Sequence, residues 1–412
     1  GGAVTIEDYL KCFEDATGRD LSHFALWYHQ AGTPVIGARS TYDAAEGRLE
    51  LTLSQSTPPT PGENDKKPLH IPLRVGLISP NGDDMEPSAV SGGERTGDVL
   101  HLTESEQTFV FEGLGAKPAI SLNRDFSAPV RVRFDQPRED RLKIAGAESD
   151  LVARWDAING LALEVLTHAT AAVRAGRSVD TDSALAAILI ETAEDSSLEP
   201  AFRALALTLP SELDIGREIG EDVDPDAIHL ARKAVFSAIA NAGRTSFARL
   251  VEDLREDNGF SPDADSAGRR ALRNTALAYL AEAEQSPLPA QCAYEAATNM
   301  TDMIAALRIL AHQFPGSGET GAVLADFRQR FEGEPLVLDK WFSVQAMGKR
   351  PETLDQVIAL SRHPDFSTKN PNRIRSLVGM FCAANQVRFH DRSGRGYAFL
   401  ADIVLDLDEM NP

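Results

Sequence analysis

Apolar positions recur along this chain with two different spacings, and the change of spacing separates helical from extended regions. Near the N-terminus the spacing is helical, with Ile6, Leu10 and Phe13 on one face of a helix that Thr5 can cap. Asp20 can cap a second helix, which extends to residue 30. We therefore predict two short helices before the spacing changes.

From Gly32 onward the apolar positions alternate with polar ones, as in strands that bury one face. Stretches rich in proline and glycine at 57–62 and 80–97 are typical of the loops between strands. The pattern predicts a small β-sandwich over residues 31–134. The alternating positions are Leu49, Leu51 and Leu53; Leu73, Val75 and Leu77; Phe109 and Phe111; and Val130, Val132 and Phe134.

Helical spacing returns after Pro137 and continues to the C-terminus, which predicts an all-α region over residues 135–412. Prolines divide it into many short helices, a spacing suited to stacked helical hairpins in a superhelix. No fixed sequence period is present, which favours an irregular superhelix over a regular repeat family. The fold class is α+β multidomain, a small β-sandwich followed by a large all-α superhelical domain. The dividing prolines are Pro200, Pro210, Pro225, Pro262, Pro287, Pro315, Pro351 and Pro371.

Charge and cysteine content narrow the function classes. The chain has 62 acidic and 41 basic residues, a net charge of -21, which argues against nucleic acid or an anionic membrane as a partner. Cys12, Cys292 and Cys382 are far apart and indicate neither a zinc knuckle nor a disulfide framework. No apolar run approaches the roughly 18 residues of a membrane-spanning helix. We expect a soluble, cytoplasmic protein with reduced thiols.

One segment near the C-terminus has an unusual charge pattern. It reads Asn370-Pro371-Asn372-Arg373-Ile374-Arg375-Ser376-Leu377. Asn370 is a good N-cap and Pro371 suits the first helical position, so a helix is predicted to begin here and to bury Ile374, Leu377, Val378 and Phe381. Arg373 and Arg375 oppose the helix macrodipole in its first turns, which points to a carboxylate partner.

This segment resembles a motif near the C-terminus of the bacterial aminopeptidase N family, zinc-dependent metallo-aminopeptidases of the gluzincin type. Further blocks agree with that family in order and span nearly the whole chain. They are Trp27-Tyr28 with Gly32-Thr33-Pro34, Ser54-Gln55-Ser56-Thr57-Pro58, Pro68-Leu69-His70-Ile71-Pro72, Glu106-Gln107-Thr108-Phe109, Arg154-Trp155-Asp156, Asn299-Met300-Thr301-Asp302, Asp339-Lys340-Trp341-Phe342 and Gly396-Tyr397 with Phe399-Leu400.

The resemblance implies a parent enzyme that removes N-terminal residues from short peptides with zinc-bound water. Its chemistry needs two histidines four residues apart on a helix, with a glutamate between them. No two of the nine histidines are four apart, and the family's Gly-x-Met-Glu-Asn segment is missing. We therefore expect no catalytic residue and no metal in this chain. The resemblance implies that its sandwich braces an upstream catalytic domain that is missing here, and that its superhelix encloses the substrate cavity. Residues 1–30 would be the helical end of that domain.

Arg375 is the candidate substrate-binding residue. The resemblance implies that it faces the internal cavity, where it can attract the carboxylate end of a short peptide. The alternative is an ion pair with an acidic residue of a neighbouring helix. Arg373 is interpreted as structural, and Asp302 and Asp339 as caps or inter-helix anchors.

A different class of function stays open from the residues alone. A sandwich followed by an α-solenoid can also be a stand-alone scaffold that binds a protein partner. The native N-terminal sequence would distinguish the two functions.

The ends of the chain have their own signals: Gly1-Gly2 resembles a cloning remnant, and Asn411-Pro412 follows an apolar pattern without a tail of disordered composition. We expect both ends to be cuts within a longer protein, and the helical domain to be truncated.

Overall fold

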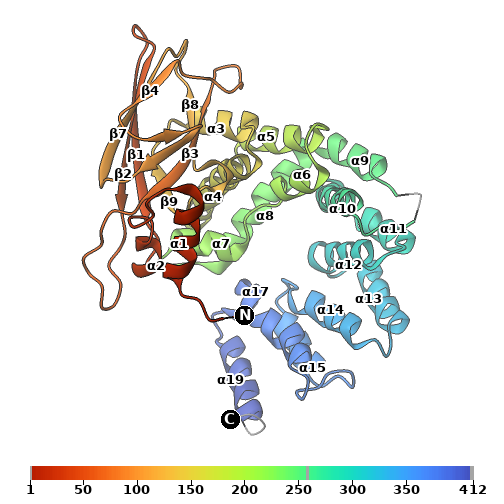
Figure 1. The fold of residues 1–412 in the computed structure, drawn as a ribbon. Coiled ribbons are helices and arrows are strands. Elements are labelled where there is room, and N and C mark those ends of the chain that lie inside the picture. The colour runs from red at the N-terminus through yellow and green to blue at the C-terminus, as the bar shows by residue number, and fades with distance from the viewer. Residues whose placement is uncertain (1, 257–258, 409–412) are drawn as a thin grey trace. The chain divides into compact units, whose positions relative to one another are not determined.

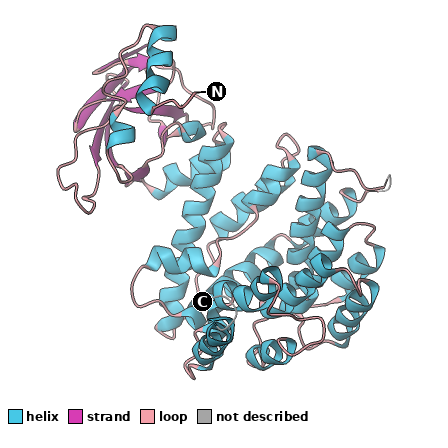
Figure 2. Cartoon of the chain, turned by 60° about the horizontal axis from the view of Figure 1, so that its bottom comes forward, coloured by secondary structure: helices cyan, strands magenta, loops and turns pink. Residues whose placement is uncertain are grey.

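The structure is a computed structural model that describes residues 2–256 and 259–408. The chain divides into two compact units, the sandwich unit (Gly1–Ile158) and the helical unit (Asn159–Pro412). Figure 2 shows that the strands are confined to the sandwich unit. The residues on which the expectation of two cut ends depends, Gly1 and Asn411-Pro412, lie outside the described part.

The sandwich unit contains two sheets, as the alternating pattern predicted. One has the strand order β4-β7-β2-β1-β9 and the other the order β5-β6-β3-β8. All neighbours are antiparallel except β1 and β9. The strands are β1 (Val35–Asp43), β2 (Arg48–Ser56), β3 (Ile71–Ile78), β4 (Ala89–Ser91), β5 (Arg95–Thr96), β6 (Val99–Leu102), β7 (Glu106–Glu112), β8 (Ala119–Leu122) and β9 (Arg131–Phe134).

The predicted apolar positions form the core between these sheets. Leu51 pairs with Phe109 across β2 and β7, and both side chains are fully buried. Leu73 on β3 is equally buried in the facing sheet and belongs to the same core. Strand β9 differs from the prediction: Val132 is 37% exposed, because β9 is an edge strand that extends the sheet beyond β1.

The N-terminal helices are partly as predicted. Helix α1 (Ile6–Thr17) begins at Thr5, whose hydroxyl accepts from the Asp8 backbone N–H in a capping box. The second helix, α2 (Leu26–His29), is a single turn, so the prediction of a helix from 21 to 30 was too long. Residues before it form turns, and the Asp20 carboxylate caps only the Ser22 N–H.

In the helical unit, most helices pack against the next helix along the chain (Figure 1). Proline at the first helical position starts α6, α8, α14 and α16, since it lacks the N–H that would be unpaired there. The predicted sandwich and all-α superhelix are thus confirmed as the fold class. Beyond α3 (Arg138–Ala147) the helices are α4 (Leu151–Arg174), α5 (Ser183–Glu194), α6 (Pro200–Ala206), α7 (Glu212–Ile219), α8 (Pro225–Ala242), α9 (Arg244–Asp253), α10 (Ala264–Glu284), α11 (Leu288–Ala296), α12 (Met300–Gln313), α13 (Gly318–Arg330), α14 (Pro335–Ala346), α15 (Thr353–Leu360), α16 (Pro371–Ile374), α17 (Met380–Ala384), α18 (Gln386–Phe389) and α19 (Arg395–Asp408).

Tyr279 on α10 anchors the first half of this unit. Its ring is stacked between Phe236 of α8 and Phe247 of α9, with centroid separations of 4.3 and 4.8 Å. Its hydroxyl donates to the Leu207 carbonyl at 2.7 Å, so the buried polar atom is satisfied. Three helices are therefore joined at one aromatic stack.

Candidate functional site

The arginine-containing segment begins a helix where the sequence predicted. The Asn370 side chain accepts from the Asn372 N–H at 3.0 Å and caps α16. The backbone then forms a π-helical segment, Arg375–Gly379, before α17 continues the helix. Leu377 and Phe381 are fully buried, as expected. The π segment was not predicted, although such segments are frequent at functional positions.

Arg373 is buried and joins α16 to α14 through three contacts. Its Nε lies 2.7 Å from the Asp339 carboxylate on α14, and its Nη2 donates to the Pro335 carbonyl at 3.0 Å. Its guanidinium also lies 5.1 Å from the ring centre of Phe342. The interpretation of Arg373 as structural and of Asp339 as an inter-helix anchor is confirmed.

Arg375 has a different environment, although it is only two residues away. Its side chain is exposed, and among the described residues no acidic side chain forms an ion pair with it. Gly379 follows four residues later and has no side chain to cover the arginine stem. The alternative of an ion pair with a neighbouring helix therefore gains no support from the described part of the chain, and the substrate-binding role stays a prediction.

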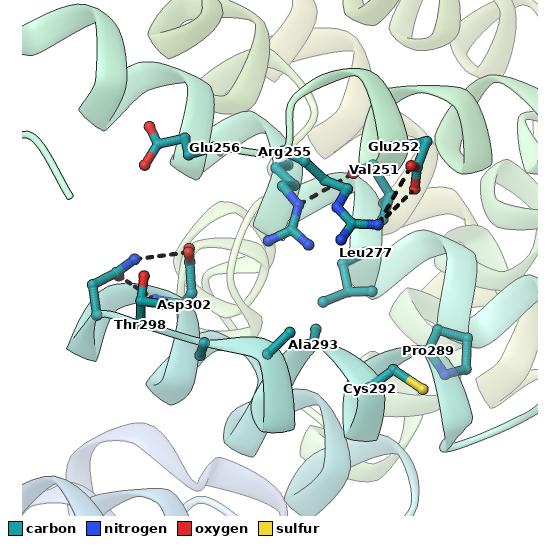
Figure 3. A pocket seen from close by; sticks show the side chains of 14 residues that line it. Val251, Glu252, Arg255, Glu256, Leu277, Pro289, Cys292, Ala293, Thr298 and Asp302 are labelled. Carbon is teal, nitrogen blue, oxygen red and sulfur yellow. Dashed lines mark hydrogen bonds and ion pairs between the residues drawn. The ribbon is translucent and has the colours of Figure 1, made fainter. Parts of the chain in front are cut away.

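A cleft of about 360 Å³ lies between α9, α10, α11 and the start of α12 (Figure 3). Figure 3 shows Arg255 paired with Glu252 above Leu277 and Ala293. Asp302 accepts from the side-chain amides of Asn274 and Asn299 at 2.8 and 2.9 Å, which confirms it as an inter-helix anchor. The polar groups of this cleft bond largely to one another. Arg375 is not part of its lining.

A partly buried carboxylate, Glu212 on α7, joins parts of the helical unit that are far apart in sequence. One oxygen lies 2.8 Å from His229 Nδ1 on α8, and the other accepts from Lys349 Nζ at 2.9 Å. Burial alone raises the pKa of Glu212, but the His229 hydrogen bond and the Lys349 charge outweigh it and lower the pKa to about 2. No sequence motif marks these three residues, so sequence reasoning missed the cluster.

The side chains that could bind a metal ion are scattered in the described part of the chain. Residues 2–256 and 259–408 contain no group of three or more His, Cys, Asp and Glu side chains that could hold a metal ion. His70 and His101 do meet, but their ring nitrogens hydrogen-bond to each other at 2.8 Å. The other ring nitrogen of His101, Nε2, hydrogen-bonds to the Thr96 hydroxyl at 3.1 Å. Both ring nitrogens of His101 therefore have partners within the sandwich unit. No helix in the described residues is long and apolar enough to cross a membrane.

Two family models match the chain, one over the part that contains the strands and one over the helical part. Residues 32–135 match the family described as "Domain of unknown function (DUF3458) Ig-like fold". Residues 138–412 match "Domain of unknown function (DUF3458_C) ARM repeats". The predicted domain boundaries at 30/31 and 134/135 stay predictions.

Similar proteins give a consistent picture. The chain is 41% identical to a protein named aminopeptidase N from Caulobacter vibrioides and 32% identical to one from Escherichia coli; each alignment covers all of this chain and 46% or 47% of the relative. A solved structure of Legionella pneumophila aminopeptidase A in complex with aspartic acid superposes with a TM-score of 0.82 at 27% identity, over 100% of this chain and 47% of that one. The chain thus spans about half the length of these relatives. By its match over residues 138–412 it belongs to the DUF3458_C ARM-repeat family, and its resemblance to aminopeptidase N is confirmed over its whole length.

Proposed function

We propose that this chain is the non-catalytic, C-terminal region of a zinc aminopeptidase that removes N-terminal amino acids from short peptides. The observation that carries the proposal is the end-to-end similarity to proteins named aminopeptidase N, of which this chain spans less than half. In this proposal zinc and the catalytic residues belong to the other half of the parent protein. The sandwich unit braces that half, and the helical unit encloses the substrate cavity.

The apolar face of α1 supports contact with a further domain. Ile6, Tyr9 and Phe13 are 43%, 53% and 46% exposed, and only Leu10 of this helix is buried. An amphipathic helix whose apolar face is uncovered is typical of a surface that packs against another domain. We propose that the catalytic half of the parent protein covers this face.

Cysteine placement is consistent with a cytoplasmic parent protein. Cys12 and Cys292 are exposed, Cys382 is half-buried, and all three are free thiols. Free surface thiols persist in reducing compartments, whereas secreted proteins usually pair them.

Hydrolysis of alanyl 4-nitroanilide by the purified chain with added zinc tests the accessory role. We expect no turnover above the blank, because the described residues do not assemble a zinc site. The parent protein, assayed in parallel, serves as the positive control. Chelator-sensitive turnover by the chain alone at stoichiometric zinc would overturn the proposal.

Arg375→Gln in the parent enzyme tests the substrate-binding role. The exposed Arg375 guanidinium, which has no partner among the described residues, can pair with the free carboxylate of a short peptide, and the loss of such a charged hydrogen bond costs about 1.5–3 kcal/mol. We expect KM for a tripeptide to rise about tenfold or more, and KM for the same tripeptide with an amidated C-terminus to stay unchanged.

The amidated peptide controls for indirect effects of the substitution on the cavity. Lys369→Gln removes a neighbouring exposed positive charge and controls for long-range electrostatic effects. Equal changes in KM for the acid and the amide would show that Arg375 does not recognise the peptide carboxylate.

A further inference from the structure

The helical unit contains a second cavity, of about 500 Å³, whose wall has an excess of positive charge. Four cationic side chains line it, while only two carboxylates do. This excess lies within a chain whose net charge is -21, so general composition does not explain it. The cationic residues are Arg232, Lys233, Lys349 and Arg350, and the carboxylates are Glu212 and Glu282.

Only one of the two carboxylates in this wall is paired with basic side chains in the described part of the chain. Glu212 is held between His229 and Lys349. Glu282 on α10 is only 8% exposed and accepts a hydrogen bond from the Ser237 hydroxyl. Neither carboxylate forms an ion pair with Arg232 or Lys233 in the described part of the chain, so these two cations are not neutralised by the wall.

Arg232 and Lys233 have no charged partner in the described part of the chain, and Arg350 has one that is largely exposed. Arg232 donates from Nε to the Pro210 carbonyl at 2.8 Å, which orients the guanidinium and leaves its charge uncompensated. Lys233 is exposed and makes no hydrogen bond or ion pair among the described residues. Arg350 has one carboxylate neighbour, Glu352, at 3.3 Å, and that pair is about half exposed, so water screens it.

His312 adds a polar surface without adding charge. Burial lowers its pKa to about 4, and its Nε2 lies 2.9 Å from the Val344 carbonyl, to which the neutral ring donates. The ring of Phe236 supplies an apolar part of the wall. The cavity therefore combines arginine and lysine donors with a face that can contact a small organic body.

We propose that this cavity binds a small oxyanion, that is, a carboxylate or phosphate group carried by a compact molecule, with Lys233 and Arg350 as its main charged contacts. Lys233 belongs to α8, whereas Arg350 follows α14, so the anion joins segments distant in sequence. The Glu212–Lys349 ion pair joins α7, which packs against α8, to the same segment after α14. A bound anion would therefore stabilise the helical unit where the segment after α14 meets α7 and α8. The proposal does not depend on peptidase activity.

Isothermal titration of the chain with two probes, inorganic phosphate and N-acetylalanine, tests this site. Saturable binding of at least one probe is expected, with Lys233→Gln and Arg350→Gln each raising Kd about tenfold and the double variant losing binding. The probe that binds more tightly identifies the anion as phosphate or carboxylate. Thermal unfolding in the same solutions should show a probe-dependent rise in Tm for the unmodified chain and none for the double variant.

Two controls separate a site from general ionic effects. Lys340→Gln removes an exposed lysine elsewhere on the helical unit and should leave Kd unchanged. N-acetylalanine amide lacks the carboxylate and should not bind. A Kd above about 10 mM for both probes, or binding that Lys233→Gln and Arg350→Gln do not weaken, would overturn the proposal.

Discussion

Arg373→Ala should lower the free energy of unfolding of the helical unit by about 3–5 kcal/mol. The substitution removes the partner of a largely buried carboxylate, Asp339, and leaves that charge without compensation. It also leaves the Pro335 carbonyl without its donor and removes the contact with the Phe342 ring.

Denaturant unfolding followed by the fluorescence of Trp341 measures this effect, because Trp341 is only 7% exposed in the core of the same unit. Replacing Trp27 and Trp155 by phenylalanine in every variant removes the other tryptophan signals. Arg375→Ala is the matched control, and its effect should stay within about 0.5 kcal/mol because that side chain is exposed. Similar losses for the two variants would show that Arg373 has no special structural role.

Arg124→Ala should destabilise the sandwich unit by a similar amount, about 3–5 kcal/mol. Arg124 is 8% exposed and bonds through Nη2 and Nε to both oxygens of Glu148, at 2.7 and 3.1 Å. Glu148 is only 1% exposed, so removal of the arginine leaves a buried carboxylate unpaired. The Arg124 guanidinium also pairs with Asp84, and these contacts join the segments around residues 84 and 124 to the end of α3.

The glycine at position 76 makes room for this guanidinium. A Cβ added to Gly76 would lie 1.9 Å from Arg124 Cζ, which is far closer than atoms can pack. Gly76→Ala should therefore destabilise the sandwich unit through displacement of Arg124, and the two substitutions combined should cost less than the sum of their separate effects.

Fluorescence of Trp27 and Trp155 in a Trp341→Phe background reports on this unit during denaturant unfolding. Replacing both Arg124 and Glu148 by methionine should recover part of the loss, since no charge is then left buried. A loss below about 1 kcal/mol for Arg124→Ala would show that water solvates Glu148 without its partner.

Local sequence patterns predicted helices and strands correctly where the deciding feature, a cap residue or an alternation of apolar positions, lies within the element itself. Thr5 and Asn370 cap helices where they were expected to, and Leu51 and Phe109 are buried as the alternation indicated. The same logic was wrong about the length of α2 and the burial of Val132, because the number of helical turns and the cover over an edge strand depend on neighbouring elements.

The two arginines of one motif show where sequence reasoning ends. Arg373 and Arg375 are two residues apart, and on a helix such positions face different directions. Which of them is buried depends on where Asp339 and Phe342 of α14 are packed, and this contact is not encoded locally. The sequence resemblance singled out Arg375, and the structure adds that its side chain is exposed.

By itself, the sequence determined the fold class, the helix starts at Thr5 and Asn370, the core strands and the resemblance to aminopeptidase N, because caps, periodicity and short motifs act within a few residues. Only the tertiary structure decided which charges meet. Glu212, His229 and Lys349 share one cluster, and Lys233 and Arg350 share one cavity, although each set is dispersed along the chain. Ion pairs and cavities depend on distances through space, and helix packing sets those distances.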